Sequence, residues 1–411
     1  MKFEQYHFHP DLLTSILELG FNRPTDIQYK AIPSILKGED VMAIAATGTG
    51  KTAAYAIPII QKLVSRQRNY RGIRALVLAP TRELAVQIHG VFESLGKHTD
   101  LLMVALVGGV EQNEQITLLN EEADLVVATP GRIFDLMAQK HLDLKAVETL
   151  VLDESDRMMA LGFMKDVQDI KKRLPYKHQT LFFSATINEL LKDQAYSLVR
   201  NAIRIQVSPK NSVSKNVTHS VAMIEMDDKR FFLEKIIKNH PEAKMVVFAR
   251  TQVRVDRVQK AMERVGIDVA AIHGGMEQTQ RFEALESFAN NTKKILVTTD
   301  VSARGIDIQK VIYVINYDLP EEPENYIHRL GRTGRGVEKG YALSFCSPEE
   351  LKFLEAIQAY LETVIEISPI EALDYQETKD TSADAQLDKA KIMDLIRQNE
   401  EAKPVKKHKK R

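Results

Sequence analysis

Short apolar runs alternate with longer amphipathic stretches along the first half of the chain. RALVLA (74–79), DLVVA (124–128), TLVL (149–152) and TLFF (180–183) are predicted to be buried strands. Segments such as LAVQIHGVFESLG and GRIFDLMAQ, which lie between these runs, have the apolar spacing of helices. This alternation predicts a parallel sheet with helices on both faces.

The alternation of apolar runs and amphipathic stretches is interrupted at SPKNSVSKN (208–216), a polar stretch that is typical of a linker. It then starts again, so the sequence predicts a second α/β domain after the linker. The apolar runs expected as strands of this second domain are 245–249, 268–272, 294–299, 311–316 and 341–346.

Composition narrows the class of protein. The 411 residues are 44% hydrophobic and 27% charged, and 56 Lys and Arg balance 56 Asp and Glu, so net charge does not indicate a nucleic-acid partner. The single cysteine, Cys346, excludes a disulfide framework and suits a reducing compartment. The N-terminus lacks the apolar core of a signal peptide, and no apolar run approaches about 18 residues. We therefore expect a cytoplasmic protein without membrane partners.

The last residues of the chain have a different character. Residues 369–411 are mostly polar and end in KPVKKHKKR (403–411), which carries six cations and no acid. Such a tail either keeps the protein in solution as a disordered segment or binds phosphate backbones electrostatically. The sequence leaves both interpretations open.

A glycine-rich loop follows an apolar strand at 41–44. Gly48 and Gly50 let backbone N–H groups surround a phosphate, and the helix that follows adds donors at its N-terminus. Lys51 can reach the β- and γ-phosphates of a nucleotide, and the Thr52 hydroxyl can ligate Mg²⁺. The loop departs from the general phosphate-loop pattern at its first glycine, where this chain has alanine.

Three carboxylates, Asp153, Glu154 and Asp156, follow the strand predicted at 149–152. The carboxyl ends of parallel strands are where such sheets bind ligands. Asp153 can hold Mg²⁺ directly or through water, and Glu154 can orient and deprotonate an attacking water. An acidic helix N-terminus is the structural alternative, but the upstream phosphate loop favours a nucleotide site.

Taken in order, these motifs resemble those of the DEAD-box RNA helicases, ATP-dependent enzymes built from two RecA-like domains. The resemblance covers residues 3–346, and alanine is usual at the first position of the family's phosphate loop. The matching segments are GFNRPTDIQ (20–28), AATGTGKT (45–52), PTRELA (80–85), Gly108-Gly109, TPGR (129–132), SAT (184–186), VVFART (246–251), Gln278 with Arg281, TTDVSARGID (298–307) and HRLGRTGR (328–335).

The resemblance implies a division of the chain into five parts. These are a Q-motif region at 1–29, a helicase ATP-binding RecA-like domain at 30–207, a linker at 208–216, a helicase C-terminal RecA-like domain at 217–368 and a polar tail at 369–411.

One position departs from the family pattern. Residues 153–156 are Asp-Glu-Ser-Asp, where the family has Asp-Glu-Ala-Asp. All three carboxylates are kept, so we expect metal binding and water activation to be kept as well. As a hypothesis, the Ser155 hydroxyl alters the contacts between Asp156 and the SAT motif.

The resemblance also implies roles in binding ATP and Mg²⁺. The Gln28 amide would pair with N6 and N7 of adenine, and Phe3 would stack on the purine or, alternatively, anchor the N-terminus in the core. Asp307 would hold the ribose. The expected nucleotide- and metal-binding residues are Phe3, Arg23, Gln28, Ala46, Thr47, Gly48, Thr49, Gly50, Lys51, Thr52, Asp153 and Asp307.

Hydrolysis and its coupling to RNA are expected to use further residues. Arg332 and Arg335 would reach the γ-phosphate across the interdomain cleft as arginine fingers. The expected catalytic residues are Lys51, Asp153, Glu154, His328, Arg332 and Arg335, and the expected coupling residues are Asp156, Ser184 and Thr186.

The resemblance implies that RNA is bound mainly through its sugar-phosphate backbone. Such binding is largely independent of base sequence and sensitive to salt. The expected RNA-contacting residues are Pro80, Thr81, Arg82, Gly109, Thr129, Pro130, Gly131, Arg132, Arg250, Gly274, Gln278, Arg281, Thr299 and Arg304.

The predicted function is that of an RNA-dependent ATPase that separates RNA duplexes locally or remodels ribonucleoproteins, with a monomeric core. Two alternatives remain at this point: an ATP-gated RNA clamp that rarely unwinds, and a DNA helicase or other two-domain ATPase. Strand displacement separates the first from the prediction, and stimulation by RNA against DNA separates the second.

Overall fold

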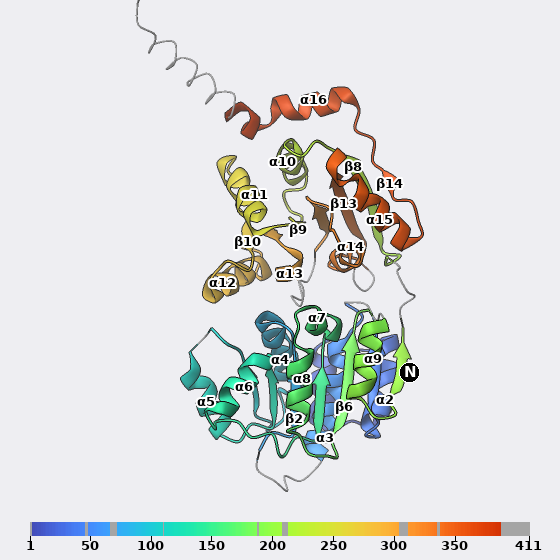
Figure 1. Ribbon diagram of the computed structural model, residues 1–411, viewed down its shortest axis with the longest axis vertical. Helices are drawn as coiled ribbons and strands as arrows, with labels where there is room; N and C mark the ends of the chain where they lie inside the picture. Colours follow the sequence, from blue (N-terminus) through green and yellow to red (C-terminus); the bar gives the residue numbers. More distant parts are fainter. Residues whose placement is uncertain are drawn as a thin grey trace, which may run out of the picture. The chain divides into compact units, whose positions relative to one another are not determined.

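The computed structural model describes residues 2–45, 48–65, 72–109, 111–186, 189–207, 213–303, 311–334 and 338–387. These residues form two compact units, with the second beginning at Val213 (Figure 1). Several predicted positions lie outside the described residues: Ala46, Thr47, Arg304, Asp307, Arg335, 208–212 of the linker and the tail from 388 onward.

The first unit is built on a parallel sheet of seven strands in the order β3-β4-β2-β5-β6-β1-β7. The predicted apolar runs are all strands of this sheet, whereas β3 and β7 were not predicted. β7 carries mostly exposed residues at one edge, so it lacks the continuous apolar run of a buried strand. The strands are β1 (Val41–Ile44), β2 (Ala75–Leu78), β3 (Met103–Leu106), β4 (Leu125–Ala128), β5 (Thr149–Leu152), β6 (Gln179–Ser184) and β7 (Ile203–Gln206).

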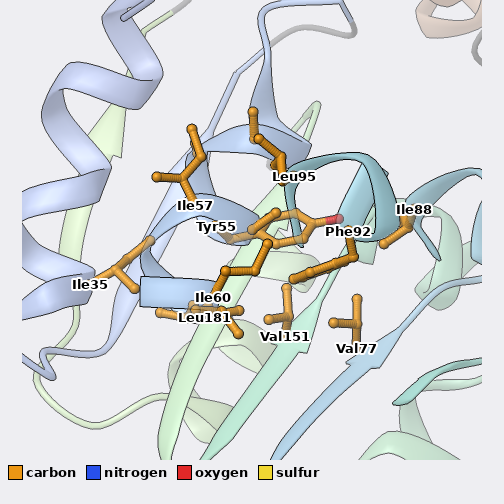
Figure 2. Packing of buried hydrophobic residues seen from close by; sticks show 14 of the residues in the cluster. Ile35, Tyr55, Ile57, Ile60, Val77, Ile88, Phe92, Leu95, Val151 and Leu181 are labelled. Carbon is orange, nitrogen blue, oxygen red and sulfur yellow. The ribbon is translucent and has the colours of Figure 1, made fainter. Parts of the chain in front are cut away.

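Alternate residues of these strands supply two separate hydrophobic cores. Val77 and Val151 belong to the core beneath α1 to α4, which Figure 2 shows from close by, and Leu76 and Leu150 belong to the core on the other face. The helices of this unit are η1 (Phe3–Tyr6), α1 (Pro10–Glu18), α2 (Asp26–Leu36), α3 (Lys51–Ser65), α4 (Arg82–Gly96), α5 (Gln112–Asn120), α6 (Pro130–Ala138), α7 (Ser155–Ala160), α8 (Met164–Lys171) and α9 (Glu189–Leu198).

The Q-motif region is an integral part of the first unit. Helix α2 runs through the boundary expected at residues 29 and 30 and packs against α3, the helix that follows the phosphate loop. Ile27 and Ile35 are fully buried in the same core as α3. The adenine motif is thereby attached directly to the phosphate loop's own helix.

The second unit repeats the architecture with a parallel sheet in the order β10-β11-β9-β12-β13-β8-β14. The prediction of two α/β domains with parallel sheets is therefore confirmed. The strands are β8 (Val217–Met223), β9 (Met245–Phe248), β10 (Ala270–Ile272), β11 (Ile295–Thr298), β12 (Tyr313–Asn316), β13 (Gly340–Cys346) and β14 (Glu366–Ile367). The helices are α10 (Lys229–Asn239), α11 (Gln252–Arg264), α12 (Gln278–Ala289), α13 (Asp300–Ala303), α14 (Pro323–Leu330), η2 (Pro348–Glu350), α15 (Leu351–Leu361) and α16 (Ala372–Thr381).

The start of the predicted polar tail is folded. Helix α16 packs against α10 (Figure 1), where the Tyr375 ring contacts Phe232 with centroids 4.8 Å apart. Beyond α16, Asp384 is fully buried and forms ion pairs with Arg230 and Arg264. The sequence analysis treated this segment as part of a polar tail and did not predict that it folds. Hydrogen bonds and ion pairs hold the segment more than an apolar stripe does.

No helix within the described ranges is both long enough and apolar enough to cross a membrane.

Candidate functional site

The phosphate loop connects the carboxyl end of β1 to the N-terminus of α3. Gly50 has a φ of +90°, and a Cβ atom on it would lie 2.5 Å from Nε2 of Gln28. Both the backbone conformation and the available space therefore require glycine at this position. Lys51, the first residue of α3, is 8% exposed and donates from Nζ to the Ala45 carbonyl at 2.9 Å. This hydrogen bond joins the end of the phosphate loop to its beginning.

Gln28 joins the Q motif to the phosphate loop. Its Oε1 accepts from the backbone N–H of Thr25 at 3.0 Å, and its Nε2 donates to the Gly50 carbonyl at 3.2 Å. An amide has a second N–H and a second lone pair, so it retains the two bonds that an adenine edge requires. Arg23, also expected near the nucleotide, is exposed just before α2.

Phe3 does not have the free ring face that purine stacking requires. Its side chain is 1% exposed and packs near Tyr6 and Phe21, with centroids 6.2 and 6.4 Å away. The structure therefore supports the alternative, in which Phe3 anchors the N-terminus in the core. A ring that stacks on an exposed ligand would have to leave this cluster.

Asp153 and Glu154 follow β5, the middle strand of the sheet. Asp153 is 3% exposed, and its Oδ1 accepts from the Glu154 N–H at 2.8 Å. Burial raises the pKa of the Asp153 carboxyl to about 6, with Lys51 opposing the shift and Glu154 adding to it. Glu154 has a φ of +47°, and this left-handed residue turns the chain sharply from the strand into α7.

Tyr55 is a residue of this site that sequence reasoning missed. Its hydroxyl donates to Oδ2 of Asp153 at 2.8 Å and is hydrogen-bonded to the Thr52 side chain. A signal was present, because residues three apart on a helix share a face and Tyr55 stands three positions after Thr52.

Asp156 contacts the SAT motif directly. Its Oδ2 accepts from the backbone N–H and from the hydroxyl of Thr186 at 3.1 and 2.9 Å, and Ser184 donates to the Thr186 carbonyl at 2.7 Å. The Ser155 hydroxyl donates instead to the Leu152 carbonyl at 3.1 Å. The Ser155 hydroxyl thus bonds to a residue outside the Asp156–SAT contact, and the hypothesis that it alters that contact stays untested.

The donor set at the phosphate loop fits Mg²⁺. Mg²⁺ is usually held by one or two carboxylates together with phosphates and waters, rather than by an all-protein cage. Thr52 and Asp153 supply hard oxygen donors that Tyr55 bridges. Among the described residues, no group of three or more His, Cys, Asp or Glu side chains is placed to hold a metal ion.

The first-unit residues predicted to contact RNA lie after β2, β3 and β4, beside the nucleotide residues on the same edge of the sheet. Thr81 and Thr129 are the residues before α4 and α6, with Pro80, Pro130 and Gly131 next to them. The Arg82 guanidinium lies against Gly108, where a Cβ atom would be 3.2 Å from Nη2. Gly109, the next residue, has a φ of +77°.

Arg132 is hydrogen-bonded to polar side chains of α5 and α6. It is 8% exposed, and its guanidinium donates to Gln115 at 3.3 Å, to Gln112 at 3.1 Å and to Asp135. These bonds connect α6 to α5, and the direct RNA contact expected of Arg132 stays a prediction. Polar partners on α5 were not recognisable from sequence, because they come from a different helix.

In the second unit the corresponding residues follow β9, β10 and β11. Gly274 lies close to Gln252, Arg281 donates to the His273 carbonyl at 3.2 Å, and Gln278 begins α12. Thr299 is 7% exposed after β11. They occupy the carboxyl edge, as their counterparts do in the first unit.

Arg250 is partly engaged within the second unit. Its guanidinium pairs with Glu350, which is 1% exposed, and lies 4.8 Å from the centroid of the Phe353 ring. Lys229 and Asp318 are buried beside Glu350, so a network of buried charges lies beneath this arginine. The sequence did not predict this network.

The arginines of HRLGRTGR differ in their surroundings. Arg329 is 1% exposed and forms two hydrogen bonds with Asp300, at 2.6 and 2.7 Å, so it ties α14 to α13. Arg332 is buried after the end of α14, and His328 on α14 is half-buried. Arg335 lies outside the described residues.

Family models match both units. A DEAD/DEAH box helicase model matches residues 25–193, and a helicase conserved C-terminal domain model matches residues 228–337. The chain belongs to the DEAD-box family of ATP-dependent RNA helicases.

Relatives of this helicase include bacterial proteins. It is 38% identical to the DEAD-box ATP-dependent RNA helicase RhpA of Helicobacter pylori, over 92% of this chain and 76% of that one. It is 37% identical to CshA of Bacillus cereus, over 87% of this chain and 67% of that one.

Solved structures of similar helicases carry RNA and nucleotide. Dbp5 of S. cerevisiae bound to RNA and ADP BeF3 matches with a TM-score of 0.82 at 31% identity, over 92% of this chain and 99% of that one. Mss116p bound to ssRNA and AMP-PNP matches with a TM-score of 0.82 at 28% identity, over 93% of this chain and 81% of that one.

Proposed function

We propose that this DEAD-box RNA helicase couples RNA-stimulated ATP hydrolysis to closure of its two domains and to local separation of RNA duplexes. One observation carries the proposal. The predicted nucleotide residues after β1 and β5, the predicted coupling residues after β6 and the predicted RNA residues after β2, β3 and β4 share one edge of one sheet. The Asp156–Thr186 contact lies within the nucleotide half of that edge.

In the proposed mechanism, Gln28 reads adenine while the loop from Gly48 to Thr52 surrounds the phosphates. Lys51 leaves the Ala45 carbonyl to pair with the β- and γ-phosphates. Thr52 and Asp153 would hold Mg²⁺, which would supply positive charge to neutralise the phosphates. Glu154 accepts a proton from the attacking water.

The second domain completes the proposed site. Arg332 and Arg335 stabilise the charge that develops on the γ-phosphate, an effect of roughly 10³–10⁵ in rate for arginine fingers. His328 and Asp307 assist from the same domain. Hydrolysis would therefore depend on closure, which makes it sensitive to RNA bound across both domains.

RNA is proposed to bind through its backbone. Arg82, Gly109, Thr129 and Gly274 would approach the sugar-phosphate chain, with little reading of bases. We propose a monomeric core, with ribonucleoprotein partners selecting the cellular RNA. A cytoplasmic location also remains a prediction.

The test is steady-state ATP hydrolysis without nucleic acid, with single-stranded RNA and with single-stranded DNA. We expect stimulation by RNA alone and its loss in Glu154→Gln. Equal stimulation by DNA would contradict the RNA assignment. A parallel strand-displacement assay separates unwinding from clamping, because a clamp would hydrolyse ATP and retain RNA without releasing the partner strand.

A further inference from the structure

Tyr55 places a hydroxyl group at the edge of the hydrophobic core beneath α1 to α4. The residue is 0% exposed, and its ring lies edge-on to Phe183, with centroids 5.1 Å apart, and tilted against Phe92 at 6.1 Å. Figure 2 shows this ring among apolar side chains of α3 and α4, including Ile60 and Leu95. Close packing leaves the ring little freedom to rotate or shift.

The hydroxyl of this fixed ring lies between the two predicted Mg²⁺ ligands. It donates to Oδ2 of Asp153 at 2.8 Å and is hydrogen-bonded to the Thr52 side chain. The phenol O–H is the donor in the bond to Asp153, because a carboxylate oxygen can only accept.

The Asp153 carboxylate is held from two sides. Its Oδ1 accepts from the backbone N–H of Glu154 at 2.8 Å, and its Oδ2 accepts from Tyr55. Without the Tyr55 hydroxyl, the backbone bond would hold only Oδ1, and Oδ2 of this carboxylate, which is 3% exposed, would lose its phenol donor. The phenol is thus the side-chain contact that orients the carboxylate relative to Thr52.

We propose that Tyr55 is a positioning residue for the Mg²⁺–ATP site, holding the Thr52 hydroxyl and the Asp153 carboxylate in the arrangement that binds the cation. The inference rests on the proposed function in taking these two residues as the ligands. Groups that orient metal ligands typically change metal affinity by about 10–100-fold when removed. A tyrosine that served only the core would change stability instead.

The test is Tyr55→Phe, which removes the hydroxyl and keeps the ring. Affinity for a fluorescent ATP analogue is titrated against free Mg²⁺ and also measured in EDTA. We expect the half-saturating Mg²⁺ concentration to rise about 10–100-fold, with affinity in EDTA unchanged. The same Mg²⁺ dependence as in wild type, or equal losses with Mg²⁺ and in EDTA, would overturn the inference.

The matched control is Tyr375→Phe. That tyrosine also donates to a carboxylate, Asp228, at 2.9 Å, but in the second unit. We expect it to leave the Mg²⁺ titration unchanged. In an Asp153→Asn background, Tyr55→Phe should have a smaller effect on Mg²⁺ dependence than in wild type, because only the contact with Thr52 is left to lose. An undiminished additional loss would show that Tyr55 does not act through Asp153.

Two outcomes separate this inference from the proposed function. If wild type itself binds nucleotide independently of Mg²⁺, the proposed metal site fails. If wild type depends on Mg²⁺ and Tyr55→Phe behaves identically, only the role of Tyr55 fails. Should Tyr55→Phe not fold, 3-fluorotyrosine at position 55 gives a ¹⁹F signal that must shift when Mg²⁺ is added to the nucleotide complex. An unmoved signal would overturn the inference.

Discussion

Asp156 holds Thr186 by two hydrogen bonds to one carboxylate oxygen, one from the backbone N–H and one from the hydroxyl. The contact joins the turn after β5 to the turn after β6, its neighbour in the sheet. Ser184 fixes the same turn through the Thr186 carbonyl, and its own carbonyl accepts from Ala45 at the start of the phosphate loop. These bonds therefore connect the carboxyl ends of three adjacent strands, β5, β6 and β1.

Thr186→Val should uncouple the two activities. It removes the hydroxyl bond to Asp156, and a hydrogen bond to a charged group contributes about 1.5–3 kcal/mol. We expect strand displacement to slow by roughly 10–100-fold, with ATP affinity nearly unchanged. Thr186→Ser keeps the hydroxyl and is the control. A parallel fall in ATP affinity would show that the contact serves nucleotide binding rather than coupling.

Ser155→Ala should affect stability and little else. The Ser155 hydroxyl donates to the Leu152 carbonyl and supports the turn at Glu154. Loss of one such bond should lower the free energy of unfolding by about 0.5–1.5 kcal/mol, as measured by urea denaturation. The ratio of unwinding to ATP hydrolysis should stay at the wild-type value, and a changed ratio would restore a coupling role for Ser155.

The second unit should lose stability on mild acidification through His219. Burial lowers the pKa of this histidine, whose ring contacts Tyr326. As the pH falls below about 6.5, the unfolded chain takes up this proton before the folded chain does, so acid favours unfolding. Denaturation at pH 7.5 and 5.5 should show a smaller pH effect in His219→Gln than in wild type. Equal effects would exclude His219 as a contributor.

The folded part of the tail should be separable from the rest by truncation. A chain ending at 387 keeps α16, whereas one ending at 368 loses the Tyr375–Phe232 contact and the bond from Ser382 to buried Glu234. We expect the shorter chain to lose about 2–4 kcal/mol of stability in the second unit. Equal unfolding midpoints for the two truncations would show that α16 contributes nothing to stability.

Deleting 403–411 tests the basic cluster. If its six cations meet phosphates, RNA affinity falls and the slope of log affinity against log salt becomes less steep, because fewer counterions are released. Fluorescence anisotropy at several salt concentrations measures both quantities, and nucleotide affinity should not change. An identical slope would remove this cluster from RNA binding.

Local pattern was enough to predict the strand–helix rhythm, the two α/β domains and the phosphate loop. Buried parallel strands are continuous apolar runs, and a phosphate loop is a contiguous segment, so each carries its signal within a few residues. Edge strand β7 and the polar helix α16 were not predicted, because neither has an apolar pattern of its own.

By itself, the sequence determined the family, the fold class and the positions of Lys51, Asp153 and Glu154. Only the tertiary structure decided which side chains meet. In the structure, Phe3 is buried in the core, Arg132 bonds to a residue of α5, and Ser155 bonds to Leu152. Tyr55 bonds to Asp153, which is 98 positions away in the sequence. These contacts join residues from different elements, and they depend on strand order and packing, which no local pattern encodes.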